Sequence, residues 1–216
     1  MQTIFRILLN ALINLAIIVP NSFGQITKDL KFGFGVGPNL STFTGSGDND
    51  RGWVPGVRGG FYVQKPLENG VIVEPGLYYS NLGSRSSFMA YDENTFEEVE
   101  QKERFFLSYL NVPVVARYKV SGNVSVFAGP QVSFLVGGKK KLKYSGEKEK
   151  VDAKDEFKTV SAGVSMGAAY EFEGGERLQL SVNPGFTNNS KSEGGYGGSE
   201  KSRIFSFALL FNCPLE

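Results

Sequence analysis

Residues Phe32–Ser41 read FGFGVGPNLS, and their side chains alternate between two kinds. Every second residue from Phe32 to Leu40 is apolar, whereas the residues between them are glycine or asparagine, and Ser41 follows. A period of two puts alternate side chains on opposite faces of a β-strand. The stretch therefore predicts a strand with one apolar face and one face of small or polar residues.

Seven further stretches repeat this alternation, and no window shows helical periodicity. Near the end of the chain, for example, apolar residues from Phe205 to Phe211 alternate with Ser206, Ala208 and Asn212. The eight predicted strands lie near 31–43, 53–64, 70–82, 104–119, 123–136, 156–172, 177–188 and 201–212. We therefore predict an all-β chain.

The small, polar faces of these strands distinguish a soluble fold from a membrane fold. In a soluble sandwich or a lipocalin-like barrel the apolar face points inward and the polar face meets water. In an outer-membrane barrel the apolar face meets lipid, and the other face fills a narrow lumen. Here the second face consists mostly of Gly, Ser, Ala and Asn with a few charges, which is typical of a crowded interior and favours the membrane barrel.

The connections between the predicted strands alternate in length. Three short connections, near 65–69, 120–122 and 173–176, alternate with four long polar ones, near 44–52, 83–103, 137–155 and 189–200. Outer-membrane barrels have short periplasmic turns and long extracellular loops, and closure pairs every backbone group that lies in hydrocarbon. The pattern predicts an eight-stranded antiparallel up-and-down transmembrane β-barrel with both mature termini in the periplasm.

The first 24 residues have the features of a cleaved secretory signal. Arg6 is followed by the apolar run Ile7–Val19, and Ser22 and Gly24 place small residues just before a cleavage site at Gln25. The apolar run is shorter than the roughly 20 residues that a membrane-spanning helix needs. We expect a signal peptide over 1–24, a barrel domain over 25–216 and a location in the outer membrane.

Composition argues against most catalytic classes. The 216-residue chain has no histidine, which is the commonest general base and metal ligand, and its single cysteine, Cys213, excludes an internal disulfide or a cysteine zinc cluster. Its 23 basic residues nearly balance its 22 acidic ones, so no net field favours nucleic acid. We expect no enzyme activity, no cofactor, no metal and no nucleic-acid partner.

Several stretches resemble the PorT-like outer-membrane β-barrel family. The resemblance is carried by Tyr109–Tyr118 (YLNVPVVARY), Val126–Val132 (VFAGPQV), Gly33–Leu40 (GFGVGPNL) and Gly56–Tyr62 (GVRGGFY). It implies an eight-stranded barrel of the OmpX and OmpA type in the outer membrane. In some members of such families it also implies a role in secretion or surface assembly.

Two groups of charged residues are candidates for structural or functional roles. Arg58, Glu74, Arg117 and Glu171 share the parity of the inward faces, so they predict an ion network inside the lumen, with Arg58 and Glu74 as cross-strand neighbours. A proton path is the functional alternative. The long connections carry acidic and basic stretches that predict interaction hairpins, turning near Asp92–Asn94 and Ser145–Gly146; their residues are Glu97, Glu98, Glu100, Glu103, Lys139, Lys140, Lys141 and Lys143.

Three functions are compatible with these features. The first is a non-catalytic structural or surface-interaction barrel, whose partners are outer-membrane lipid and lipopolysaccharide or another envelope protein. The second is an accessory subunit of an outer-membrane secretion or assembly machine, as the resemblance allows. The third is a narrow pore, although eight strands leave a lumen that side chains can fill.

Overall fold

A computed structural model describes residues 30–45, 50–67, 70–91, 98–144, 147–191 and 202–215. They form ten β-strands and a short 3-10 helix; no helix among them is long and apolar enough to cross a membrane. The elements are β1 (Lys31–Thr44), β2 (Asp50–Gly52), β3 (Val54–Pro66), β4 (Val71–Tyr91), β5 (Glu98–Ser121), β6 (Val124–Tyr144), β7 (Glu147–Asp152), η3 (Lys154–Glu156), β8 (Val160–Glu171), β9 (Arg177–Pro184) and β10 (Arg203–Leu215). The predicted signal peptide over 1–24 lies outside the described residues.

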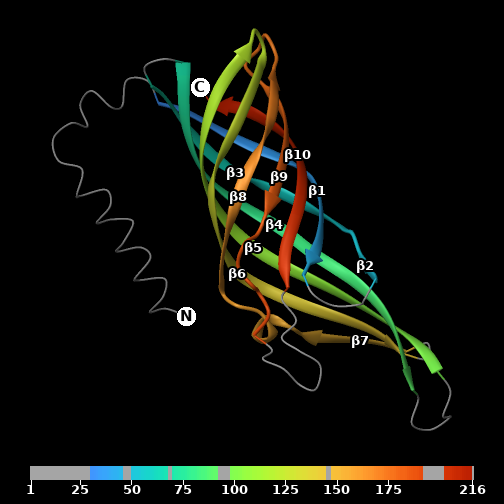
Figure 1. Cartoon of the computed structure of the whole chain (residues 1–216). Helices are drawn as coiled ribbons and strands as arrows, with labels where there is room; N and C mark the ends of the chain where they lie inside the picture. Colours follow the sequence, from blue (N-terminus) through green and yellow to red (C-terminus); the bar gives the residue numbers. More distant parts are fainter. Residues whose placement is uncertain are drawn as a thin grey trace. The chain divides into compact units, whose positions relative to one another are not determined.

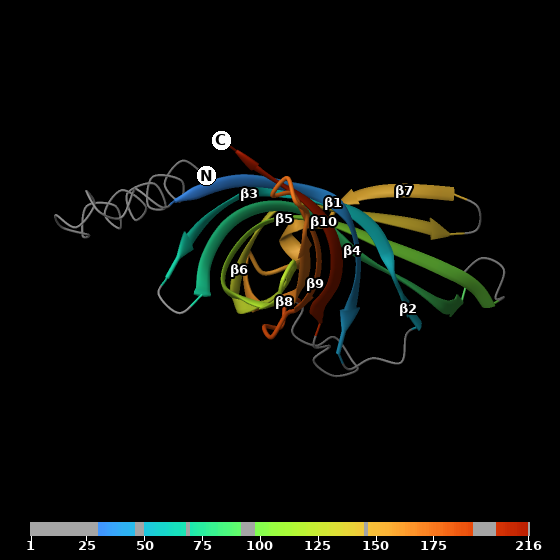
Figure 2. The same cartoon turned by 90° about the horizontal axis from the view of Figure 1, so that it is seen from above.

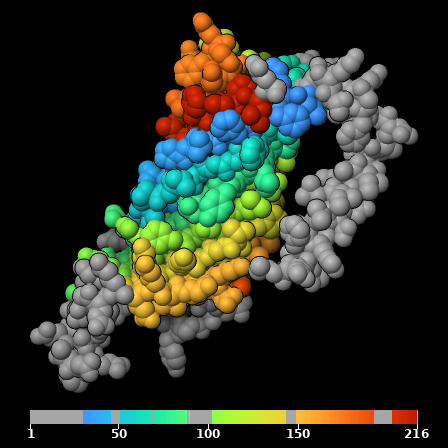
Figure 3. All heavy atoms as spheres, turned by 180° about the vertical axis from the view of Figure 1, so that it is seen from behind, coloured from blue at the N-terminus to red at the C-terminus, as the bar shows by residue number. Residues whose placement is uncertain are grey.

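Eight of the strands close into a ring. In the order β1, β3, β4, β5, β6, β8, β9 and β10, each strand pairs antiparallel with the next, and β10 pairs back with β1. Figure 2 shows these strands around a common centre, and in Figure 3 the red of β10 lies beside the blue of β1. The predicted eight-stranded up-and-down barrel is therefore confirmed.

Three strands are much longer than the alternation indicated. We predicted strands near 70–82, 104–119 and 123–136, whereas β4 ends at Tyr91, β5 begins at Glu98 and β6 ends at Tyr144. Both faces of these extensions carry charged or polar residues, so hydrophobic alternation gives no signal there. Backbone pairing nevertheless continues, from Tyr79↔Leu110 to Tyr91↔Glu98 between β4 and β5.

The apolar face of the ring points outward and the small, polar face points inward. Phe34, Val36 and Leu40 are exposed on β1, whereas Asn39 and Ser41 are buried. The exposed belt continues around the ring through Val57, Phe61, Leu77, Val114, Val126, Val132, Met166, Leu180, Leu209 and Phe211. Inside, Gly33 lies beneath the ring of Tyr62, and a Cβ added at Gly33 would collide with that ring. Small residues on this face thus leave room for large lumen side chains.

The two ends of the ring differ in their connections. Short turns join β3 to β4, β5 to β6 and β8 to β9, and they use the left-handed residues Gly70, Gly122 and Gly175, with φ of 75°, 39° and 87°. The first residues of β1 and the last of β10 pair at this same end, as Phe32↔Leu215. At the other end the strands continue as long hairpins. We call the two ends the short-turn end and the hairpin end.

At the hairpin end the wall extends beyond the ring as an open sheet. β2 pairs with β4, β4 with β5, β5 with β6, and β7 with β6. Figure 1 shows β2 and β7 beside the long ends of β4, β5 and β6. We call this five-stranded extension the hairpin sheet.

Candidate functional site

Glu74 lies on the lumen face of β4, at the centre of a buried ion network. Arg117 binds it with a two-pronged contact, in which Nη2 donates to Oε1 at 3.0 Å and Nε donates to Oε2 at 3.2 Å. Nη1 of Arg177 donates to Oε2 at 2.8 Å, and Nε2 of Gln64 donates to the same oxygen at 2.7 Å. Arg117, Glu74 and Arg177 are only 1%, 4% and 3% exposed. One carboxylate therefore pairs with two guanidinium groups that are buried away from water.

Arg58 also points into the lumen. Among the described residues, its contacts do not include the Glu74 carboxylate. Its Nη1 donates to Oδ1 of Asn183 on β9, and its Nη2 donates to Oε1 of Gln131 on β6, both at 3.3 Å. Because Arg58 is on β3, these bonds cross the lumen to the opposite wall.

Each of the three buried arginines also lies over an aromatic ring. The distance from the guanidinium carbon to the ring centroid is 4.8 Å for Arg58 and Tyr78, 4.8 Å for Arg117 and Phe127, and 4.7 Å for Arg177 and Tyr62. Such contacts contribute up to about 2 kcal/mol when they are desolvated. Among the described residues, three buried arginines face one buried glutamate, so the rings stabilise cations that the carboxylate does not neutralise.

The network differs from the predicted one in two members. The carboxylate of Glu171, at the end of β8, binds Nζ of Lys119 at 3.3 Å, and its side chain is 34% exposed. Arg177 lies directly opposite Glu171 in the strand register, but its longer side chain reaches into the lumen to Glu74. Sequence analysis missed Arg177, although it shares the inward parity of Gln179. The parity was informative, but only the guanidinium of Arg177 can pair with the carboxylate of Glu74, whereas Glu171 carries the same charge as Glu74 and pairs with Lys119.

The predicted pairing of Arg58 with Glu74 is also wrong in register. The β3–β4 turn pairs Lys65 with Val73 and Arg58 with Ser80. This places Gln64 beside Glu74, in agreement with their 2.7 Å hydrogen bond. β3 runs on to Pro66 and β4 begins at Val71, so the turn lies later in the chain than the connection at 65–69 that the sequence suggested, and every cross-strand partner is shifted.

An apolar cluster blocks the lumen toward the hairpin end. The rings of Phe43, Phe105 and Phe157 pack against one another with centroids 5.4–5.9 Å apart. Leu82, Leu107, Tyr109, Leu135 and Ile204 complete this aromatic plug. Phe43 lies near the end of β1, where it is 7% exposed and points inside the ring, as Asn39 and Ser41 do.

Among the described residues, two small cavities lie beside these side chains. A cavity of about 30 Å³ lies against Tyr109 and Gln131, and one of about 10 Å³ lies against Arg58 and Glu74. A cavity needs a volume of about 10–15 Å³ to hold a single water. On the side of the plug that faces the hairpin end, an open cavity of about 520 Å³ is lined by the three phenylalanines of the plug. Polar residues that include Arg51, Glu103, Asp155 and Glu156 also line it.

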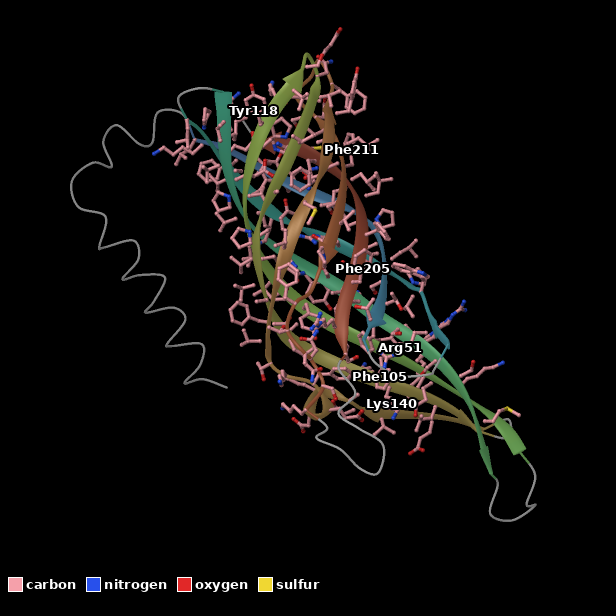
Figure 4. All side chains as sticks on the ribbon, in the orientation of Figure 1. Arg51, Phe105, Tyr118, Lys140, Phe205 and Phe211 are labelled. Carbon is pink, nitrogen blue, oxygen red and sulfur yellow. The ribbon has the colours of Figure 1, made fainter. Side chains whose placement is uncertain are left out.

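The predicted interaction residues lie on the hairpin sheet. Glu103 and Lys140 point to the same face and form an ion pair of 3.1 Å, with Lys140 over the ring of Phe105; Figure 4 labels Lys140, Phe105 and Arg51 toward this end. Lys139 and Lys141 point to the opposite, outer face. Glu97 lies outside the described residues, as do the side chains of Glu98, Glu100 and Lys143 and both predicted hairpin turns.

Comparisons with known proteins identify a family and several similar folds. Residues 21–191 match the family model of the outer membrane protein beta-barrel domain. Among solved structures, Neisserial surface protein A is 10% identical over 84% of this chain and 95% of its own, with a TM-score of 0.49. The attachment invasion locus protein Ail of Yersinia pestis is 12% identical over 86% of this chain and 99% of its own, with a TM-score of 0.45. OprG of Pseudomonas aeruginosa is 10% identical over 88% and 97%, with a TM-score of 0.39. No curated protein sequence is similar enough to the chain to count as a relative.

Proposed function

The chain belongs to the outer membrane protein beta-barrel domain family, and we propose that it is a non-catalytic, non-conducting barrel that acts at the cell surface through its hairpin sheet. The observation that carries this proposal is the continuation of β4, β5 and β6 beyond the ring, where β2 and β7 widen them into a sheet. A barrel that needed only to cross the membrane would not require these extra strands.

The orientation follows the usual asymmetry of such barrels. Short turns face the periplasm and long loops face outward, so the hairpin sheet is extracellular and both termini of the mature chain are periplasmic. Residues 1–24 are removed as the secretory signal. Within this family we place the chain among PorT-like barrels, on the strength of the Tyr109–Tyr118 and Val126–Val132 motifs.

The lumen supports a structural role. Its buried charges are engaged with one another, with amides and with aromatic rings, which leaves no carboxylate poised for proton transfer among the described lumen residues. The ion network and the aromatic plug close the lumen in series. Either one interrupts a water path, so a pore is the least supported function.

We expect planar-bilayer recordings of the folded protein to show no steady conductance. The cavities of about 30 and 10 Å³ hold at most a few waters and cannot pass a hydrated ion. A wide porin recorded in the same bilayer provides the positive control. Stable ion-selective steps from the purified chain would contradict the proposal and favour the pore.

Surface labelling tests the orientation. In a Cys213→Ser background, Met89→Cys on the hairpin sheet should react with a membrane-impermeant maleimide on intact cells, whereas Leu67→Cys at the short-turn end should react only after lysis. Met89 and Leu67 are 61% and 46% exposed, so both thiols are accessible once the reagent reaches them. The reverse labelling would place the hairpin sheet in the periplasm, as a secretion accessory could require.

A further inference from the structure

The outer face of the hairpin sheet carries four cations in one cross-strand row. The register pairs Arg85 with Arg104, Arg104 with Lys141, and Lys141 with Lys150. Paired residues point to the same face of a sheet, and all four side chains are exposed. Neighbouring strands are about 4.8 Å apart, so the row spans about 14 Å. We call Arg85, Arg104, Lys141 and Lys150 the cation row.

Such a row is unfavourable for the sheet alone. Like charges directly opposite each other destabilise an antiparallel pair, and here three successive pairs have like charges. No described side chain forms an ion pair with any of the four. An anion that bridged the row would relieve this repulsion, because each of its charges would lie between two cations.

The residues beside the row indicate what kind of anion binds. The ring of Phe106, next to Arg104 on β5, lies 5.7 Å from the guanidinium of Arg104 and 4.8 Å from Nζ of Lys141. Farther along the same outer faces, Leu77 and Tyr79 on β4, Val114 on β5, and Val132 and Val136 on β6 belong to the exposed apolar belt. A ligand on the row thus has cations at one end and a lipid-facing wall at the other.

We infer that the cation row binds the phosphate groups of a phosphorylated lipid in the outer leaflet, whose acyl chains lie along the apolar wall of β4, β5 and β6. The inference rests on the proposed function, since it requires the hairpin sheet to be extracellular. A soluble polyanion would match the row but not the wall. The lipid matches both, and it would fix the hairpin sheet at the membrane surface.

Titration of the folded barrel in uncharged detergent tests the inference. The probe is hexa-acylated lipid A with two phosphates, and its dephosphorylated form and inorganic pyrophosphate serve as separate arms. Each cation near an anionic surface contributes a factor of about five, so Arg104→Gln with Lys141→Gln should weaken binding about 30-fold. Arg85→Gln with Lys150→Gln should have a comparable effect. Dephosphorylated lipid and pyrophosphate should bind weakly to every variant.

Arg203→Gln with Lys158→Gln is the matched control, because it removes one exposed arginine and one exposed lysine at the hairpin end but outside the row. It should retain wild-type binding. Equal loss in the control would assign the effect to net charge and overturn the inference. So would a wild-type barrel that does not bind the lipid, or one that binds a soluble sulfated polysaccharide through the row instead. A heat-dependent mobility shift in SDS verifies that every variant is folded.

A trimmed chain tests whether the cation row binds lipid without the ends of the hairpins. Replacing 88–101 and 142–149 each by Asn-Gly joins Ser87 to Lys102 and Lys141 to Lys150, which are already cross-strand partners. The trimmed chain keeps the row and should keep lipid binding.

If wild type fails to bind lipid but remains non-conducting and surface-labelled, only the inference fails. Periplasmic labelling of Met89→Cys would instead remove the proposed function.

Discussion

Glu74→Ala should destabilise the folded barrel by about 3–5 kcal/mol, because it leaves two buried guanidinium groups without their carboxylate. Arg117 and Arg177 contact Glu74 at 3.0 and 2.8 Å, and both arginines are almost completely buried. Equilibrium unfolding in urea from detergent micelles measures the loss. Glu171→Ala is the control: its ion pair with Lys119 is half-exposed, so we expect a loss of at most about 1 kcal/mol.

Second substitutions identify which cation the loss depends on. Arg177 forms its hydrogen bonds to described side chains only through Glu74, whereas Arg117 also bonds to Ser125 and Gln179. Glu74→Ala with Arg177→Met should therefore regain more than half of the lost stability. Glu74→Ala with Arg58→Met should regain little, since Arg58 bonds to Gln131 and Asn183 instead. Equal recovery in the two double variants would mean that net lumen charge, and not these contacts, sets the effect.

The sequence predicted the ring because one physical constraint acts along the whole of each membrane-crossing strand. Lipid outside and a crowded lumen inside require apolar and small residues to alternate along the whole strand. β10 is an example: it was predicted near 201–212 and extends over Arg203–Leu215. That constraint ends at the edge of the apolar belt. The extensions of β4, β5 and β6 are held by backbone pairing and carry charged or polar residues on both faces, so their sequences give no periodic signal.

The contacts inside and outside the ring depend on register, which alternation does not determine. Parity alone put Arg58, Glu74 and Arg117 on the inner face, and the structure buries all three there. Which of them touch depends on where one turn is centred along the chain and on the guanidinium of Arg177, which binds Glu74. The cation row depends on three successive registers, one of which shifts at Ser108 and Tyr109. A single sequence shows its lysines and arginines but not that they are aligned.

Leu209→Arg should destabilise the barrel in a bilayer by about 2–4 kcal/mol, because it puts a cation on the lipid-facing wall near the middle of β10. Leu209 is 41% exposed and lies opposite Leu180 of β9, within the apolar belt. Val124→Arg is the matched control. Val124 is also 41% exposed, but it is the first residue of β6, next to the short turn at Gly122, where the arginine reaches the headgroups and the cost falls to about 0–1 kcal/mol.

Unfolding of both variants from phosphatidylcholine vesicles measures the difference. Lipid on the outer face makes the cost of arginine depend on depth, because the bilayer centre offers a cation no water and no partner. Water on the outer face would make both substitutions nearly neutral, since an exposed arginine there is fully hydrated. Equal small losses at Leu209 and Val124 would therefore contradict a membrane-spanning barrel.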